Sequence, residues 1–372
     1  MVNSLDTING RRIRIALVGC GRISRNHIKA IALHHERAEL VALCDTEQQR
    51  LDSAQHLISE AAQEYPASAN KPEQFIGYDN LLEAIKSNSL KVDLVVLTTP
   101  SGLHPSQAIA AAGVGVHVCT EKPMATRWED GVAMVKACEA AGVRLFVVKQ
   151  NRFNRTLQLV KRQVEAGRFG RLAMVCVNVF WQRPQTYYDQ DSWRGTWALD
   201  GGALMNQASH YIDIIDWMFG PVDTLSASIA TLGRQIEAED TAAIQFRLQS
   251  GALGTMAVTM LTYPKNLEGS ITILGEEGTA KIGGTAVNKI EHWDFAGESH
   301  DDQLVDQSSY ETTSVYGFGH SAYYTNIIET LKGEADPVCD GYSGLRSLDL
   351  IISAYKSSQN QEFITIHQSN KP

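Results

Sequence analysis

The segment RIRIALVGCGRISRNHIKA, residues 12–30, decides the fold of the first half of the chain. Its apolar start, residues 12–18, predicts a short buried strand, and the residues after the glycines have a helical pattern. Gly19 and Gly21 form a G-x-G turn, with Ser24 where a third glycine usually stands. Gly19 permits a tight turn, and Gly21 lets a pyrophosphate approach the backbone at the helix N-terminus. The segment therefore predicts the opening strand, turn and helix of a dinucleotide-binding domain.

Strands and helices alternate through the rest of the first 150 residues. Further apolar runs predict strands at 38–45, 92–100, 116–123 and 143–150, with helical patterns between them, and the polar stretch 66–75 is predicted as a loop. This alternation is typical of right-handed βαβ units, which build a parallel sheet covered on both faces.

Residues 151–372 have a different pattern, because longer runs alternate between apolar and polar side chains. Such alternation predicts antiparallel strands with one exposed or partner-covered face. We therefore expect an α/β protein with two domains. Residues 1–150 would form an NAD-binding Rossmann domain with a parallel sheet. Residues 151–372 would form a substrate-binding and oligomerisation α+β domain with a large open, mainly antiparallel sheet. A C-terminal helix at about 343–359 is a candidate to pack back on the first domain.

Composition narrows the class of protein. The chain has 372 residues, enough for two cores, and a formal net charge of −9. An acidic balance argues against nucleic acid as a partner. We find no signal-peptide pattern before the first strand and no apolar run of about 20 residues, the length of a membrane span. The six cysteines are scattered, without a C-x-x-C pair. We therefore expect a reduced, cytoplasmic enzyme with no bound metal.

Asp45 ends the second predicted strand, 24 residues after Gly21 (45 − 21). A carboxylate at this place accepts hydrogen bonds from a ribose 2′-hydroxyl and repels a 2′-phosphate. The alternative is an ordinary turn with a solvated aspartate. The context favours a cofactor site, and it predicts NAD in preference to NADP.

Two further motifs follow predicted strands of the same sheet. TTPSGLH, residues 98–104, ends one strand, and EKP, residues 121–123, ends another. The carboxyl ends of parallel strands share one edge, where open α/β sheets bind ligands. Lys122 would therefore point toward the nicotinamide, although each motif could also be a plain solvated loop. The predicted cofactor-binding residues are Gly19, Gly21, Arg22, Ile23, Asp45, Thr99, Pro100, His104, Glu121, Lys122 and Gln150.

The helical segment GGALMNQASHYIDIIDWMFG, residues 201–220, carries a polar stripe. Asn206, His210 and Asp213 are spaced by four and three residues, so a regular helix would place them on one face. A histidine suits proton transfer because its ordinary pKa is near 6.5. A core histidine with satisfied hydrogen bonds is the alternative.

The segment FWQRPQTYYDQDSWRGTW, residues 180–197, is rich in aromatic residues and arginines. Its rings could stack on a sugar or a base, and its arginines could hold phosphate or carboxylate. A subunit interface would have the same composition. The predicted substrate-binding residues are Lys122, Arg152, Arg183, Trp193, Arg194, Asn206 and His210.

GCGRISRNH at 19–27, EKP at 121–123 and the later Gly-Gly helix with its histidine together resemble the Gfo/Idh/MocA oxidoreductase family, along essentially the whole chain. The resemblance implies an NAD(P)-dependent enzyme that acts on sugar or cyclitol hydroxyls, with Lys122 and His210 as catalytic residues. It also implies a homodimer or homotetramer formed through the C-terminal sheet. Many members have aspartate four residues before the histidine. Here Asn206 stands there, and a neutral amide cannot raise a histidine pKa as a carboxylate would.

Residues 192–222 are similar to a narrower branch, the WlbA/WbpB-type dehydrogenases. This resemblance implies oxidation of C3 of UDP-N-acetylglucosaminuronic acid with NAD, in the biosynthesis of lipopolysaccharide and O-antigen sugars. Two other functions are compatible with the same residues. The protein could be an inositol or simple-sugar dehydrogenase, or a non-catalytic NAD-binding regulator.

For catalysis we expect the substrate hydroxyl to lie between Lys122 and His210. His210 is favoured as the base and Lys122 as the cation that stabilises the developing alkoxide. Lys122 as the base is the open alternative, because burial lowers a lysine pKa. Whether a 2-oxoacid reoxidises NADH in place is also open.

Overall fold

The computed structural model describes residues 7–69, 71–312 and 318–366, and its contacts divide the chain into two compact units. The first unit is Met1–Val148 together with His320–Leu345. The second is Lys149–Gly319 together with Arg346–Pro372. None of the described helices combines the length and the apolar character that a membrane crossing requires.

The first unit contains a six-stranded sheet in the order β3-β2-β1-β4-β5-β6, and every neighbouring pair is parallel. This is the Rossmann strand order, which changes direction between β1 and β4 and opens a crevice at their carboxyl ends. The predicted fold class is confirmed for this unit. Its strands are β1 Ile13–Val18, β2 Ala38–Asp45, β3 Glu73–Ile76, β4 Leu94–Leu97, β5 His117–Thr120 and β6 Leu145–Val147.

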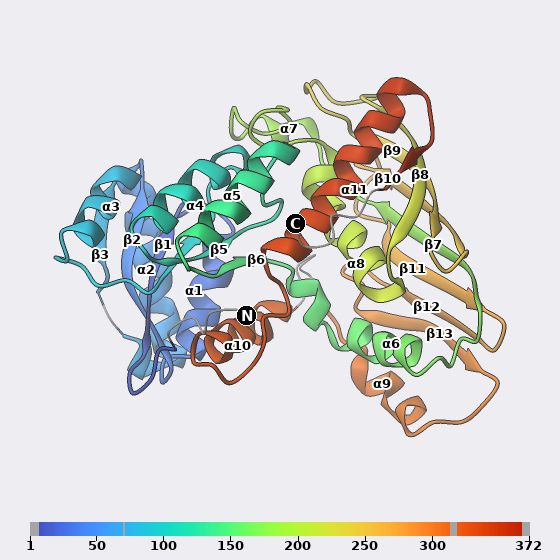
Figure 1. Ribbon diagram of the computed structural model, residues 1–372, viewed down its shortest axis with the longest axis horizontal. Helices are drawn as coiled ribbons and strands as arrows, with labels where there is room; N and C mark the ends of the chain where they lie inside the picture. The colour runs from blue at the N-terminus through green and yellow to red at the C-terminus, as the bar shows by residue number, and fades with distance from the viewer. Residues whose placement is uncertain (1–6, 70, 313–317, 367–372) are drawn as a thin grey trace. The chain divides into compact units, whose positions relative to one another are not determined.

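Helices cover this sheet, which explains its continuous apolar strands. All four residues of β4 are buried, as a strand covered on both faces requires. Helices α3, α4 and α5 lie side by side over the sheet (Figure 1), and α1 packs against α2. The helices are α1 Ser24–Leu33, α2 Gln48–Glu64, α3 Tyr78–Lys86, α4 His104–Gly113, α5 Trp128–Ala140 and α10 Gly319–Leu331, with 3-10 turns η1 Pro66–Ser68 and η2 Ser101–Leu103.

The second unit contains an eight-stranded sheet in the order β13-β12-β11-β7-β10-β9-β8-β14. All neighbours are antiparallel except β7 and β10, so the predicted mainly antiparallel sheet is confirmed. Its strands are β7 Leu172–Phe180, β8 Val222–Ala230, β9 Thr241–Leu248, β10 Leu253–Thr259, β11 Glu268–Gly275, β12 Gly278–Gly283, β13 Lys289–Phe295 and β14 Ile364–Thr365.

Helices α6, α8 and α11 lie on one face of this sheet (Figure 1). Ile215 of α8 and Leu350 of α11 meet Phe246 and Met256 of the sheet in one apolar cluster. The helices of this unit are α6 Arg155–Glu165, α7 Gln185–Tyr188, α8 Ser209–Phe219, α9 Val305–Ser308 and α11 Gly341–Asn360. The shorter turns are η3 Gln150–Phe153, the π-helical η4 Ala203–Gln207 and η5 His300–Leu304.

The other face of the same sheet carries no helix among the described residues (Figure 1). Strand β9 illustrates the alternation: Ile244 and Phe246 are buried, whereas Gln245 and Arg247 between and beyond them are exposed. Leu253, opposite Arg247 on β10, is 47% exposed. The sheet therefore presents a broad mixed surface.

Candidate active site

The glycine turn lies at the crevice between β1 and β4. Gly19 has a φ of +90°, and a Cβ there would lie 2.7 Å from the backbone carbon of Thr98, at the end of β4. Only glycine fits this conformation and this close approach. At Gly21 a Cβ would meet nothing nearer than Arg50 Nη1, at 3.7 Å. The turn is thus closed toward the sheet and open where a pyrophosphate would approach, which fits a dinucleotide.

Asp45 is fixed beside this turn at the end of β2. Its Oδ2 accepts a hydrogen bond from the Cys20 N–H at 2.7 Å, and Oδ1 accepts one from the Glu47 N–H at 3.1 Å. Each carboxylate oxygen has two lone pairs, so both can still accept a ribose hydroxyl. The backbone of the glycine turn therefore orients the predicted cofactor-reading carboxylate.

The other predicted cofactor residues of the first unit lie around the same sheet edge. Arg22 is exposed, and Ile23 directly precedes α1. Thr99 Oγ1 donates to Gln107 Oε1 at 2.6 Å, and Pro100 precedes η2. His104 has one ring nitrogen 2.9 Å from the Thr99 carbonyl and the other 3.0 Å from the Pro123 carbonyl. Burial lowers the pKa of this histidine, and a neutral ring can donate to only one of the two carbonyls.

The EKP motif begins directly after β5. The Glu121 N–H donates to the Leu97 carbonyl at 2.8 Å, so the motif remains joined to the end of β4. Lys122 is partly exposed, and the Lys122–Pro123 peptide is cis. Lys122 therefore follows the carboxyl end of β5, and its approach to the nicotinamide stays a prediction.

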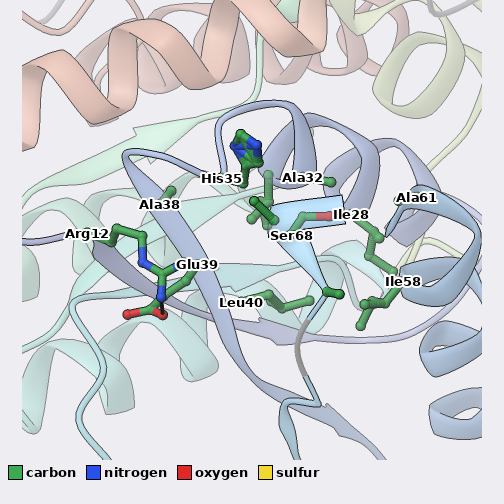
Figure 2. Close-up of a pocket in the computed structure, with 13 residues that line it drawn as sticks. Arg12, Ile28, Ala32, His35, Ala38, Glu39, Leu40, Ile58, Ala61 and Ser68 are labelled. Atoms are coloured by element: carbon green, nitrogen blue, oxygen red, sulfur yellow. Dashed lines mark ion pairs between the residues drawn. The ribbon is translucent and has the colours of Figure 1, made fainter. Parts of the chain in front are cut away.

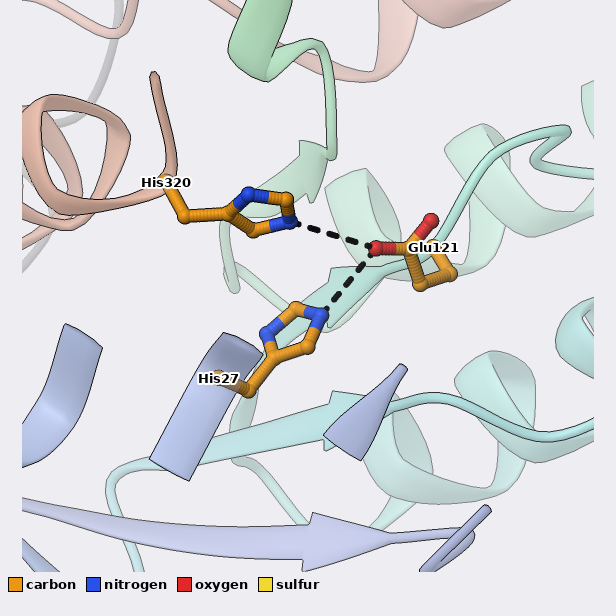
Figure 3. Close-up of side chains that lie close together, drawn as sticks. All are labelled: His27, Glu121 and His320. Carbon is orange, nitrogen blue, oxygen red and sulfur yellow. Dashed lines mark hydrogen bonds and ion pairs between the residues drawn. The ribbon is translucent and has the colours of Figure 1, made fainter. Parts of the chain in front are cut away.

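Glu121 is buried, and two histidines contact its carboxylate (Figure 3). Oε1 lies 3.1 Å from His27 Nε2 and 4.0 Å from His320 Nε2. Burial opposes ionisation, but the hydrogen bond from His27 and the positive charge of Lys122 outweigh it. They lower the pKa of Glu121 to about 2.

The segment that carries His210 differs from its prediction, because it is not one regular helix. Residues Ala203–Gln207 form a π-helical turn, and α8 starts only at Ser209. Gly201 has a φ of +77°, and a Cβ on Gly202 would lie 1.8 Å from Glu239 Oε2. Two glycines are therefore needed to bring this turn against Glu239. A π turn widens the helix, so the single regular helix predicted for this segment is wrong, and the common face of Asn206 and His210 stays a prediction.

Glu239 anchors the start of this turn. Its carbonyl accepts the Ala203 N–H at 2.8 Å, and its Oε1 accepts the Leu204 N–H at 2.8 Å and the Tyr355 hydroxyl at 3.2 Å. Burial raises the pKa of Glu239 to about 7, and these hydrogen bonds only partly offset the effect. The carboxyl thus caps helical N–H groups, and none of the cations in the described part of the chain forms an ion pair with it.

His210 is 7% exposed and lies against Gln150. The Gln150 Nε2 atom is 3.1 Å from His210 Nε2. Asn206, which we expected to orient His210 or bind the sugar, donates its amide hydrogen to Asp200 Oδ1. Gln150, predicted as a cofactor residue, is thus a neighbour of the predicted catalytic histidine in the second unit.

Asp213 joins a buried ion cluster one turn after His210. Arg152 donates to it through Nε at 2.7 Å and Nη2 at 2.6 Å, Lys149 Nζ also binds it, and Ser347 Oγ donates at 2.9 Å. Burial works against the charge on Asp213, but Arg152 and Lys149 hold its pKa well below the usual range. Arg152, a predicted substrate ligand, therefore directs two of its guanidinium nitrogens to Asp213 of α8. Its contact with substrate stays a prediction.

The arginines of the aromatic segment stack on its rings. Arg183 lies over Trp181 at 5.1 Å and Tyr187 at 5.5 Å, and Arg194 lies 4.6 Å from both the Tyr187 and Trp193 ring centres. Arg194 also donates to Asp191 at 2.9 Å. A cavity of about 290 Å³ adjoins Arg194, and its lining also contains Asp189, Asp191 and Glu237. The predicted cationic surface is therefore partly neutralised by carboxylates.

The comparison with known families agrees with this geometry. Residues 13–149 match the NAD-binding Rossmann fold of the oxidoreductase family model, and residues 161–366 match its C-terminal alpha/beta domain. The chain belongs to the Gfo/Idh/MocA oxidoreductase family.

Two solved structures resemble this Gfo/Idh/MocA protein along nearly its whole length. The WlbA dehydrogenase from Bordetella pertussis, solved with NADH and UDP-GlcNAcA, is 55% identical and has a TM-score of 0.87. The match covers 96% of this chain and 99% of that one. The WlbA enzyme from Chromobacterium violaceum, solved with the same two ligands, is 50% identical with a TM-score of 0.87, covering 98% of each chain. A D-apiose dehydrogenase from Paraburkholderia graminis is 27% identical over 96% of this chain and 91% of its own.

A cavity of about 150 Å³ in the first unit lies away from the family's cofactor edge (Figure 2). Ala38, Glu39 and Leu40 line it, and these residues begin β2, whereas Asp45 ends that strand. The opposite ends of a strand lie at opposite edges of its sheet, so this cavity is not part of the dinucleotide site.

Sequence reasoning missed three residues of this family member's site: His27, His320 and Glu239. His27 is the last residue of the quoted motif GCGRISRNH. Its place on the helix directly after the glycine turn was the available sign that it lies near the sheet edge. His320 and Glu239 reach their partners only through long-range packing, which no local pattern reports.

Proposed function

We propose that the protein is an NAD-dependent dehydrogenase that oxidises the C3 hydroxyl of UDP-N-acetylglucosaminuronic acid. The observation that carries the proposal is the 55% identity, over 96% of this chain, to a WlbA dehydrogenase solved with NADH and UDP-GlcNAcA. The TM-score of 0.87 shows that the fold agrees as well, so the substrate class is the natural inference.

In the proposed reaction, the C3 hydroxyl loses its proton as the C3–H bond gives up a hydride, and a C3 ketone forms. NAD, when bound, accepts the hydride. His210 takes the hydroxyl proton through Nε2, the ring nitrogen that lies 3.1 Å from Gln150 Nε2. Lys122 stabilises the negative charge that develops on the oxygen. The reverse assignment, with Lys122 as the base, is tested below.

Gln150 supports the choice of His210 as the base. If its amide nitrogen donates to His210 Nε2, the neutral ring carries its proton on Nδ1, and Nε2 offers a lone pair. A substrate hydroxyl would take the place of this amide donor. Gln150 would thus keep the imidazole in the tautomer that a proton acceptor requires.

The substrate's diphosphate and carboxylate need cations, and its uracil needs a stacking partner. Arg183 and Arg194 are candidates for the anionic groups, and Trp193 is a candidate for stacking. Both guanidinium groups already lie over aromatic rings, so less side-chain entropy is lost when they bind. Arg152 is less available, since Asp213 occupies two of its nitrogens.

We further propose that copies of the chain assemble through the helix-free face of the second sheet, as a homodimer or homotetramer. Leu253, at 47% exposure, is one of the apolar side chains that pairing would bury. NAD and UDP-sugars are cytoplasmic metabolites, so the enzyme would act in the cytoplasm, supplying an oxidised sugar for lipopolysaccharide and O-antigen synthesis. Light scattering that gives a monomer at micromolar concentration would contradict the assembly.

The substrate proposal is tested by NADH formation with UDP-N-acetylglucosaminuronic acid, UDP-N-acetylglucosamine and myo-inositol, side by side. One arm contains a 2-oxoacid, so that tightly held NADH can be reoxidised between turnovers. Turnover of the uronic acid alone is expected. Efficient oxidation of myo-inositol would identify a different sugar dehydrogenase, and NAD binding without reduction of NAD by any sugar would identify a regulator.

A further inference from the structure

We propose that Glu121 is a positioning residue that controls the place and the charge of Lys122, and that His27 and His320 hold it for this purpose. The inference rests on the proposed role of Lys122 in the oxidation. It concerns only residues of the first unit, whose mutual geometry is shown in Figure 3.

The two oxygens of the Glu121 carboxylate have different tasks. Oε1 accepts the hydrogen bond from His27 Nε2 at 3.1 Å, and His320 Nε2 lies 4.0 Å from the same atom. Oε2 accepts the backbone N–H of Lys122 at 3.1 Å. One oxygen is therefore held by helices α1 and α10, and the other holds the backbone from which the lysine side chain extends.

A second layer of contacts fixes His27 itself. The Tyr324 hydroxyl lies 2.8 Å from His27 Nδ1, and the His27 ring meets the His320 and Tyr324 rings edge to face. A neutral ring satisfies both neighbours in one tautomer, with Nε2–H donating to Glu121 and Nδ1 accepting from Tyr324. His27 and Tyr324 are fully buried, so the side chains have little freedom to move.

This arrangement places a permanent negative charge beside Lys122. Burial lowers the pKa of His320 to about 3, so that ring is neutral at working pH, and burial also lowers the pKa of His104. Glu121 stays ionised, with a pKa of about 2. The groups that interact electrostatically with Glu121 are His27, Lys122, His320, His104, Cys119 and Tyr324.

A fixed anion next to an amine favours the ammonium form. Glu121 would therefore keep Lys122 protonated. A protonated Lys122 can stabilise an alkoxide, but it cannot accept a proton as the base. The proposal thus also decides between the two assignments of the base. If the oxidation needs Lys122 as a cation, loss of the Glu121 charge should move the alkaline limb of the kcat profile to lower pH. If Lys122 were the base, the acidic limb would move to lower pH instead.

The test compares the wild type with Glu121→Gln, which removes the charge and keeps the shape. Glu73→Gln is the matched control, since Glu73 is an exposed residue of strand β3. Lys122 is labelled with trace acetic anhydride at pH 8, and its acetylation is read by peptide mass spectrometry. We expect Glu121→Gln to accelerate the labelling of Lys122 roughly tenfold, because more of the amine is deprotonated. The control should label like the wild type.

Glu121→Asp is the second variant, because it restores the charge on a shorter side chain. We expect it to return most of the protection from acetylation, which a merely structural role of Glu121 would not explain. It also keeps the test usable if Glu121→Gln does not fold. Labelling rates that are equal in wild type, Glu121→Gln and Glu121→Asp would overturn the proposal.

Metal analysis of the purified protein gives a second outcome that would overturn the proposal: one zinc ion per wild-type chain that is absent from Glu121→Gln. A metal ion would then take the place of the proton between His27 and Glu121. The labelling needs no substrate, so its result stands apart from the choice of sugar. If UDP-N-acetylglucosaminuronic acid is not oxidised but the labelling changes as expected, only the proposed function fails.

Discussion

The end of β5 and the start of α8 each carry one of the two side chains proposed to act in catalysis, but they are built in different ways. At the end of β5, a regular strand stops and Lys122 follows directly, with one buried carboxylate behind it. At the start of α8, His210 follows a π turn that Glu239 and Asp200 bind, and the Asp213 ion cluster binds α8 one turn later. The first site depends on the geometry of a sheet edge, and the second depends on side chains from distant segments. We therefore expect changes near Lys122 to alter chemistry, and changes near His210 to alter stability as well.

The catalytic pair gives the largest expected effect. Lys122→Met and His210→Ala should each lower kcat by about 10²–10⁴-fold, the usual contribution of acid–base and electrostatic assistance, while NAD binding stays close to that of the wild type. Steady-state kinetics and a fluorescence titration of NAD measure the two quantities. Lys136→Met, on the exposed side of α5, is the control. Near-normal turnover in either variant would remove that residue from the mechanism.

The second largest effect is expected at the ion cluster that binds α8. Asp213→Asn removes the anion that Lys149 and Arg152 share, and with it two buried ion pairs. Loss of one partner of a buried pair typically costs about 3–5 kcal/mol of unfolding free energy. Urea denaturation should show this loss. Asp79→Asn, in the first turn of α3, should change stability little. A stability loss below 1 kcal/mol in Asp213→Asn would show that the cluster does not hold α8 in place.

A substitution of Asp45 tests the proposed choice of NAD over NADP. Asp45→Ala should weaken NAD binding and reduce the preference over NADP, because each hydrogen bond to a charged acceptor contributes about 1.5–3 kcal/mol. The ratio of kcat/KM for NAD and NADP gives the answer. An unchanged ratio would mean that another group discriminates the ribose.

Glu239 gives an effect on stability that changes with pH. Its folded-state pKa of about 7 exceeds the unfolded value of about 4.3, so the native protein binds more protons between these values. Its contribution to stability is therefore complete below pH 4.3 and is lost as pH rises toward 7, at up to about 1.4 kcal/mol per pH unit. Unfolding free energies measured at several pH values should fall less steeply for Glu239→Gln than for wild type. Equal slopes would contradict the buried, cation-free environment of this carboxyl.

The sequence predicted the elements that depend on local periodicity, and it did not predict those that depend on distant contacts. The strand, turn and helix around Gly19 and the strand ends at Asp45 and Lys122 obey local periodicity, and the structure has them where we expected them. The segment 66–75, predicted as a loop, contains η1 and the edge strand β3, whose exposed side chains give no apolar signal. The π turn before His210 could not be predicted either. It depends on Glu239, which lies 29 residues beyond His210 in the sequence (239 − 210).

The central claim, that C3 of a UDP-linked uronic acid is the oxidised carbon, is tested most directly by following its hydrogen. UDP-N-acetylglucosaminuronic acid carrying deuterium at C3 is mixed with enzyme and NAD in a single turnover, and the nicotinamide product is analysed by mass spectrometry. We predict one deuterium at C4 of the nicotinamide, and a slower turnover than with the unlabelled sugar. Unlabelled NADH from this substrate, together with deuterated NADH from the C4-labelled sugar, would contradict the account.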